Sequence, residues 1–257
     1  MKLKNIIDII EKEYPKDLAY DWDNSGLFYG DLDFEIKKVM ITLDITVDVI
    51  NQAIKNEVNL IISHHPILMS KIMTLSDNSM QSEMIKLAIK NNIFIYSAHT
   101  NMDTAKNGIN KRLASLFKLK DVDILLKDKP YDDCGLGIFG TIDCPTDLYD
   151  FCNVVKENLK TPFVRVVKEN KKIKKIAIAS GSCSEIIPVA IDCGCDVIIT
   201  GDMKYHNSIE YVYGGISIID AGHFPTERIV LDMFYELLSG FDFEIIKAEI
   251  SDIFKVI

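Results

Sequence analysis

Apolar runs and amphipathic segments alternate along almost the whole chain. Short β-branched runs between polar breaks are typical of buried strands, and apolar positions three and four residues apart are typical of helices that cover a sheet. The pattern predicts strands near residues 37–43, 58–63, 92–97, 135–142, 163–167, 175–180, 196–200 and 216–220. It predicts helices near residues 3–13, 46–56, 80–90, 106–118, 147–158, 184–193, 206–213 and 226–238, with Thr46 and Thr146 as N-caps. The chain is therefore expected to have an α/β fold.

The chain also repeats part of itself. Residues 37–41 align with residues 174–178, 137 positions later, and residues 59–63 align with 196–200 at the same offset. Residues 93–98 then resemble residues 216–221. The repeat predicts two related α/β lobes with a metal site in the cleft between them. A charged break at 118–133 suggests lobes of residues 1–125 and 126–257, with the C-terminal helix and tail packing back on the first lobe.

Composition narrows the classes of partner. The net charge is −9 with only three arginines, which disfavours an electrostatic grip on nucleic acid. No apolar run approaches the roughly 18–20 residues of a membrane span, and charges interrupt the apolar start of the chain, unlike in a signal peptide. We therefore expect a cytoplasmic protein with no membrane partner. The six cysteines include no Cys-x-x-Cys pair and are expected to be reduced thiols, with Cys193 and Cys195 a weak metal candidate.

Histidines and carboxylates carry the candidate chemistry. The five histidines each follow closely on an apolar run and are His64, His65, His99, His206 and His223. Asp103 lies four residues after His99, and Glu227 lies four residues after His223, so the two halves of the repeat end in matching pairs. Imidazole nitrogens with carboxylate oxygens suit zinc, iron, manganese or cobalt. The pattern therefore predicts a metal site.

The number of donors favours two metal ions over one. Adjacent histidines in an extended segment point to opposite sides, so one ion would hardly take both His64 and His65. Two divalent ions with a bridging carboxylate can hold a bridging water and generate a hydroxide near neutral pH. The predicted ligands are His64, His65, Asp103, His223 and Glu227. Glu227 follows Pro225, which suits the first position of a helix, so its carboxylate is expected in the first turn.

Other residues keep two interpretations open. His99 is a candidate partner for Asp103 or for a metal-bound water, which makes it, with Glu227, a catalytic candidate. His206 is expected to orient neighbours or to meet substrate. Residues 22–26 form either a turn with a buried indole, from Trp22, or a loop that faces substrate. Residues 181–184 form either an ordinary turn or an anion site, and Cys183 has no neighbouring base that would make it a nucleophile.

Together these motifs resemble the Nif-three-like (NGG-one-interacting factor three) proteins, the GTP cyclohydrolase 1 type 2 homologs. The resemblance runs in order through residues 22–27, 60–66, 98–103, 199–206 and 220–227. It implies two lobes around a dinuclear centre, with His65 and Asp103 on one metal, His64 and His223 on the other, and Glu227 bridging. It also implies a ring-shaped homohexamer, a trimer of dimers. The short 118–133 segment indicates a member without a mid-chain inserted domain.

The activity that the resemblance implies is hydrolytic opening of the guanine imidazole ring of GTP, by attack of a metal-bound hydroxide at C8. A nucleotide or phosphorylated small molecule is thus the expected substrate, although Lys204 and Arg228 are the only basic residues near the motifs. The same ligands would serve a two-metal phosphoesterase. A non-catalytic ring that binds metal or recruits a partner is the third interpretation. Of these three, we predict that the protein is a dinuclear, metal-dependent hydrolase.

Overall fold

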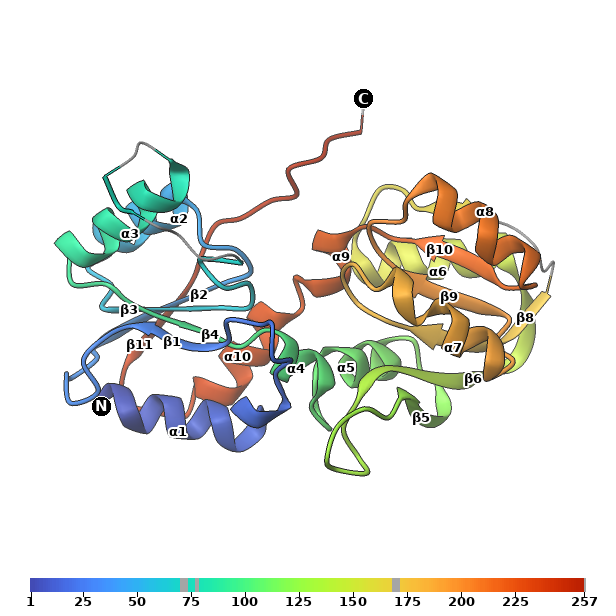
Figure 1. Ribbon diagram of the computed structural model, residues 1–257, viewed down its shortest axis with the longest axis horizontal. Helices are drawn as coiled ribbons and strands as arrows, with labels where there is room; N and C mark the ends of the chain where they lie inside the picture. The colour runs from blue at the N-terminus through green and yellow to red at the C-terminus, as the bar shows by residue number, and fades with distance from the viewer. Residues whose placement is uncertain (70–73, 77–78, 168–171, 257) are drawn as a thin grey trace. The chain divides into compact units, whose positions relative to one another are not determined.

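The computed structural model describes residues 1–69, 74–76, 79–167 and 172–256. The chain divides into two compact units (Figure 1). Unit 1 comprises Met1–Met102 and Ile229–Ser251, and unit 2 comprises Asp103–Arg228 and Asp252–Ile257. The division lies at residue 102 and not at the expected residue 125, because α5 (Ile109–Leu116) packs on the sheet of unit 2 and β5 (Lys120–Leu126) is a strand of that sheet.

Among the described residues, unit 1 contains a five-stranded sheet in the order β1-β4-β3-β2-β11. Its strands are β1 (Gly26–Tyr29), β2 (Lys38–Thr42), β3 (Leu60–Ser63), β4 (Phe94–Ser97) and β11 (Glu244–Lys247). β11, β2, β3 and β4 run parallel, and β1 pairs antiparallel with β4. The loops that follow β2, β3 and β4 therefore meet at one edge of the sheet, where α/β proteins bind their ligands.

Helices cover both faces of this sheet. They are α1 (Leu3–Glu13), the 3₁₀ helix η1 (Lys16–Leu18), α2 (Val47–Lys55), α3 (Met80–Lys90) and α10 (Val230–Leu238). α2 and α3 lie on one face, and α1 and α10 lie on the other (Figure 1). Thr46 accepts a hydrogen bond from the Val49 amide and caps α2 as predicted. Buried side chains such as Met40, Ile50 and Ile61 form the core between the sheet and α2 and α3.

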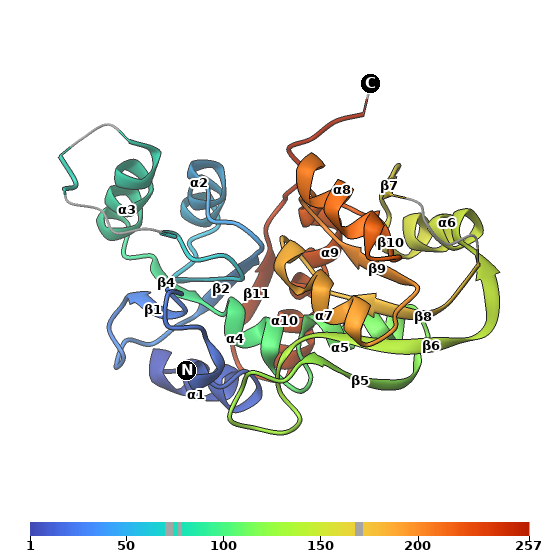
Figure 2. The same ribbon diagram turned by 45° about the vertical axis from the view of Figure 1, so that its right-hand side comes forward.

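Unit 2 contains a six-stranded sheet in the order β5-β6-β8-β9-β10-β7 among the described residues. Its further strands are β6 (Leu136–Asp147), β7 (Arg165–Val167), β8 (Lys172–Ile178), β9 (Val197–Thr200) and β10 (Ser217–Asp220). Its further helices are α6 (Leu148–Leu159), η2 (Ser184–Ile186), α7 (Ile187–Asp192), α8 (Tyr205–Tyr213) and α9 (His223–Glu227). α7 and α8 lie over one face and α5 and α6 over the other (Figure 2).

The predicted repeat is confirmed at the level of strand register. Val39 pairs with Leu60 across β2 and β3, and Ile176 pairs with Val197 across β8 and β9, each partner lying 137 positions after its counterpart. In both units the next parallel strand, β4 or β10, is flanked by an antiparallel strand, β1 or β7. Each unit therefore has the predicted α/β fold, and the two units are related to each other by the repeat.

Several predicted elements need correction. The charged break contains β5, whose exposed and half-buried charges place it at the sheet edge. The predicted helix 226–238 is two helices, α9 and α10. Asp147 caps α6 in place of Thr146, because its carboxylate accepts from the Tyr149 amide. The short strands β1 and β11 were not predicted. In the described part of the chain no helix is long and apolar enough to cross a membrane.

Candidate metal centre

Three histidines of unit 1 gather at the carboxyl edge of its sheet. His64 and His65 directly follow β3, and His99 follows β4 after one residue. The two strand ends are joined by a hydrogen bond of 2.8 Å between the hydroxyls of Ser63 and Ser97. Each histidine offers a ring nitrogen within 4.8 Å of those of the other two. Neighbouring parallel strands thus bring together residues that are more than thirty positions apart.

Each of these imidazoles is oriented through its Nδ1 atom. Nδ1 of His64 lies 2.8 Å from the Ala98 carbonyl, that of His65 lies 2.6 Å from Asp44, and that of His99 lies 2.8 Å from Asp23. Carbonyl and carboxylate oxygens accept, so Nδ1 donates in each case. In the neutral ring the lone pair is then on Nε2, as a metal ligand requires, and the carboxylate raises its basicity.

The adjacent histidines do not point to opposite sides, which corrects the expectation from an extended backbone. β3 ends at Ser63, and its hydroxyl donates to the His65 carbonyl at 2.7 Å, which turns the chain at this point. The rings of His64 and His65 are 5.0 Å apart and tilted by 46°. His64 is completely buried, whereas the side chain of His65 keeps 17% of its surface exposed. Both imidazoles therefore contribute to one cluster.

Asp23 is a site residue that the sequence interpretation missed. Its fully buried side chain accepts hydrogen bonds from His99, from the Ser25 hydroxyl, and from the hydroxyl and amide of Thr100. Burial alone raises the pKa of this carboxyl, but the hydrogen bond and charge of His99, with the hydroxyls of Ser25 and Thr100, hold it well below its usual range. The carboxylate thus stays ionised and fastens His99 to the loop after Tyr20.

Replacing Asp23 by asparagine is expected to lower the free energy of unfolding by about 2–4 kcal/mol at pH 7, because buried donors lose an ionised acceptor. The pKa of this carboxyl is lower in the folded than in the unfolded protein. Its contribution to the free energy of unfolding is therefore complete above the unfolded pKa of about 4 and is lost as pH falls toward the folded pKa. Urea unfolding from pH 7 down to pH 3 should show that the difference in free energy of unfolding between the wild type and Asp23→Asn decreases only below about pH 4. The matched control is Asp21→Asn, an exposed neighbour expected to change little.

Unit 2 places a second group on α9. This helix begins at His223 after Gly222, so His223 and Glu227 lie one turn apart, with 2.9 Å between Nε2 and Oε2. The predicted position of Glu227 in the first turn of a long helix is wrong, because the helix starts two residues before Pro225. Nδ1 of His223 lies 2.8 Å from Asp202, whose backbone is left-handed at φ 55°. His223 is therefore oriented by a carboxylate in the same way as His65 and His99.

Asp103 belongs to the same group. A carboxylate oxygen of Asp103 lies within 4.8 Å of one from Glu227, and Glu227 is only 4% exposed. Asn110 links Asp103 to the loop after β8 by donating to the Asp103 carbonyl and accepting from the Ser180 amide. Two nearby carboxylates with a histidine attract a cation, since like charges at this distance repel unless one is neutralised.

Cys183 and Gly181 border this group. Burial raises the pKa of the Cys183 thiol well above its usual range, and Asp103, Glu185 and Glu227 raise it further. The protonated thiol donates to the Ser180 carbonyl at 3.2 Å, and a raised pKa disfavours a nucleophilic role. The Gly181 amide donates to the Thr226 hydroxyl at 3.1 Å, which favours the interpretation of residues 181–184 as an ordinary turn.

The Duf34/NIF3 (NGG1p interacting factor 3) family pattern matches residues 1–253 of this chain. The chain belongs to this family. It is 39% identical over 255 residues to a "GTP cyclohydrolase 1 type 2 homolog" of Methanocaldococcus jannaschii, covering 97% of this chain and 100% of that protein. A protein of the same description from Clostridium acetobutylicum is 38% identical over 229 residues, covering 88% and 85%. The resemblance stated from the motifs is thereby confirmed.

Solved structures of family members have the same fold. Reduced HcgD from Methanocaldococcus jannaschii superimposes with a TM-score of 0.84 at 37% identity, covering 96% of this chain and 97% of that one. A Bacillus cereus protein related to NIF3 superimposes with a TM-score of 0.89 at 24% identity, covering 100% and 99%.

In this Duf34/NIF3 chain, the five predicted ligands lie in two groups. The group of unit 1 has His64 and His65 with His99, and the group of unit 2 has Asp103, His223 and Glu227. The group of unit 1 offers three imidazole nitrogens, and the group of unit 2 offers one imidazole nitrogen with carboxylate oxygens, which are donors that can bind a metal.

His206 lies outside these groups. It is exposed on α8, and its ring contacts Tyr205. Lys204 and Arg228 are exposed as well, and the Arg228 guanidinium lies over the Phe224 ring. Among the described residues, neither Cys193 nor Cys195 belongs to a group that could hold a metal.

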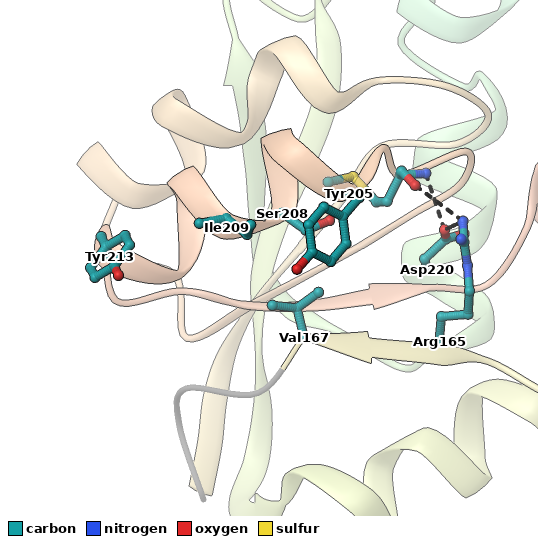
Figure 3. Close-up of a pocket in the computed structure, with 8 residues that line it drawn as sticks. Arg165, Val167, Tyr205, Ser208, Ile209, Tyr213 and Asp220 are labelled. Carbon is teal, nitrogen blue, oxygen red and sulfur yellow. Dashed lines mark hydrogen bonds and ion pairs between the residues drawn. The ribbon is translucent and has the colours of Figure 1, made fainter.

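A separate pocket of about 400 Å³ lies on unit 2 between β7 and α8 (Figure 3). Arg165 pairs with the buried Asp220 at one end, and Tyr213 lies at the other (Figure 3). Asp220 also accepts from the amides of Met203 and Gly222, which ties together the loops that carry Asp202 and His223. Because Asp220 neutralises Arg165, this end of the pocket supports the loops more than it attracts an anion.

Proposed function

We propose that this protein binds two divalent transition-metal ions and hydrolyses a small molecule with them. The observation that carries the proposal is the shared orientation of four imidazoles, each bonded through Nδ1 to a carbonyl or carboxylate. Histidines that bind a metal almost always donate their other ring N–H to such an acceptor. The donor set of imidazole nitrogens and carboxylate oxygens suits zinc, iron, manganese or cobalt.

The ligands assigned to the two ions are His64, His65, Asp103, His223 and Glu227. Three of them belong to unit 2 and two to unit 1, so the centre would be complete only when both units contribute. The internal repeat and the resemblance to Nif-three-like proteins support this assignment, with His65 and Asp103 on one ion, His64 and His223 on the other, and Glu227 shared. The homohexamer that the resemblance implies is proposed with it, and light scattering in solution measures it.

A pair of divalent ions supplies Lewis acidity, which activates water at neutral pH. The side chains of the protein orient the metal-binding atoms and accept the proton that hydrolysis releases. Asp44, Asp23 and Asp202 keep the rings of His65, His99 and His223 in one orientation. His99 is held by an ionised carboxylate, so its imidazole is suited to accept a proton released in hydrolysis.

The relatives named "GTP cyclohydrolase 1 type 2 homolog" suggest which bond to test first. Opening the imidazole ring of guanine consumes water and releases C8 as formate. A phosphoesterase with the same ligands would instead release phosphate. Formate and phosphate are measured independently in one incubation, so the two reactions are separable.

We expect metal-loaded protein to release formate from GTP and the Glu227→Gln variant to lose at least about a hundredfold in rate, because a ligand to both ions loses its charge. Coupled formate detection and mass spectrometry of the nucleotide measure it, with chelated protein as the blank. Phosphate release without formate would replace the cyclohydrolase with a phosphoesterase. Intact nucleotide and intact phosphate esters after long incubation with two bound metals would contradict the hydrolase proposal and leave a metal-binding scaffold.

A further inference from the structure

Trp22 is the single tryptophan of the chain, and 64% of its surface is exposed. The indole is therefore not buried in the turn, and the interpretation of residues 22–26 as a turn around a buried ring is wrong. A large exposed aromatic ring by itself is common on protein surfaces and indicates nothing. What distinguishes Trp22 is how firmly its neighbours are held and what lies next to it.

The turn that carries Trp22 is anchored on both sides. The Asp23 amide donates to the Tyr20 carbonyl at 2.9 Å, which closes a tight turn with Trp22 near its tip. The Tyr20 amide donates to the Thr100 hydroxyl at 3.1 Å, and the Asp23 carboxylate also bonds to Thr100. The Tyr20 ring stacks on the indole at 5.9 Å with only 9° between the planes. The indole is thus exposed and yet held in place before any ligand arrives.

The indole adjoins the histidine cluster of unit 1. The rings of Trp22 and His99 are 6.1 Å apart and nearly perpendicular. His99 in turn lies 5.2 Å from His64 and 5.6 Å from His65, ring to ring. A ligand that contacts the exposed indole therefore has His99 and the candidate metal ligands as its next neighbours.

We propose that Trp22 is a stacking platform for a planar heteroaromatic ring, such as a nucleobase, in the substrate. The proposal deepens the proposed function by naming the part of the substrate that is recognised and the residue that recognises it. Aromatic side chains bind bases through stacking without reading their edges, because every base has a π face. Trp22 would therefore select for the class of ring-bearing substrates and not for one base.

Charge around the platform favours a ring over a phosphate group. The residues of unit 1 include no arginine, which is the usual partner of a phosphate. Asp21 and Asp23 flank Trp22, and the Asp23 carboxylate stays ionised. A polyanion placed on the indole would be repelled by these negative charges, whereas an uncharged base would not.

Because Trp22 is the only tryptophan, its fluorescence reports on this site alone. We expect guanosine and adenosine to quench it saturably in chelated, metal-free protein, with excitation at the red edge where purines do not absorb, and ribose 5-phosphate to leave it unchanged. Equilibrium dialysis of guanosine should show a loss of roughly tenfold or more for Trp22→Ala and a smaller loss for Trp22→Phe, which keeps a ring. Tyr213→Ala, an aromatic 88% exposed on unit 2, is the matched control and should bind as the wild type does.

Equal guanosine affinity in wild type and Trp22→Ala, with circular dichroism showing both folded, would overturn the proposal. Quenching by ribose 5-phosphate as strong as by guanosine would overturn it too, and a loss confined to Tyr213→Ala would move base recognition to the pocket of unit 2. Working without metal separates this proposal from the hydrolase proposal. If purines bind through Trp22 but no formate or phosphate is released with metal present, the platform stands and the proposed reaction fails.

Discussion

Glu227→Gln protein is expected to retain less than half of the roughly two metal equivalents per chain that we predict for the wild type. Glu227 is buried, with a carboxylate 2.9 Å from His223 and within 4.8 Å of a carboxylate oxygen of Asp103. Glutamine has nearly the same shape and still bonds to His223, so the fold is kept while the negative charge is lost. Affinity should fall by about a hundredfold or more, beyond what loss of a supporting residue costs. Plasma mass spectrometry on protein purified without chelator measures the metal content directly.

The matched control is Glu210→Gln, which removes the same charge from an exposed position on α8. It should leave the metal content unchanged. Unfolding of the two metal-free variants should differ little, which separates a loss of metal from a loss of structure. Wild-type protein that contains no transition metal and takes up none on reconstitution would remove the metal centre altogether.

Replacing Gly181 by alanine should cause the second large loss of metal. Gly181 has φ 65°, and a Cβ atom built there would lie 2.0 Å from Oε1 of Glu227 and 3.3 Å from Nε2 of His223. The flexible end of the Glu227 side chain can move away more cheaply than the backbone, so the carboxylate is displaced from its position. We expect the metal content to fall about as far as in Glu227→Gln, and the free energy of unfolding to fall by about 2 kcal/mol or more.

Gly194→Ala separates the backbone strain from the clash. Gly194 has a similar φ of 68°, but no heavy atom lies within 4 Å of the added Cβ. This variant should lose only about 1–2 kcal/mol, the cost of a left-handed backbone for alanine, and should bind metal as the wild type does. If both glycine variants bind metal normally, the close approach of Gly181 to Glu227 has no bearing on the site.

The supporting carboxylates could not be found from local patterns. Asp23, Asp44 and Asp202 lie in three separate loops, and the motifs at residues 22–27 and 199–206 do not show which histidine each of these acids would contact. Asp23 binds His99 across 76 positions, and Asp44 and Asp202 bind their histidines across 21 positions. These pairings depend on which strands are neighbours in the sheet, and short motifs do not contain that information.

Trp22 and β5 show the same limit in different ways. A tryptophan in a turn fits a buried or an exposed ring equally well, and the hydrogen bonds of Asp23 and Tyr20 to Thr100 decided the outcome. The charged segment at 118–133 has the pattern of a break between lobes. A strand at the edge of a sheet can carry exposed charges, so its sequence does not differ from that of a polar connection. Only its pairing with β6 identifies β5 as a strand.

The sequence by itself determined the α/β architecture and the internal repeat, because these are recorded in local periodicity and in the similarity of two stretches of the chain. It also predicted five ligands from the spacing of histidines and carboxylates within short segments. The shared register of β2–β3 and β8–β9 bears out the repeat. Tertiary structure alone decided that His64 and His65 turn into one cluster, that α9 begins at His223, and that each imidazole is held through Nδ1. The physical reason is that side-chain orientation is set by hydrogen bonds between distant loops, which form only once parallel strands have brought their carboxyl ends together.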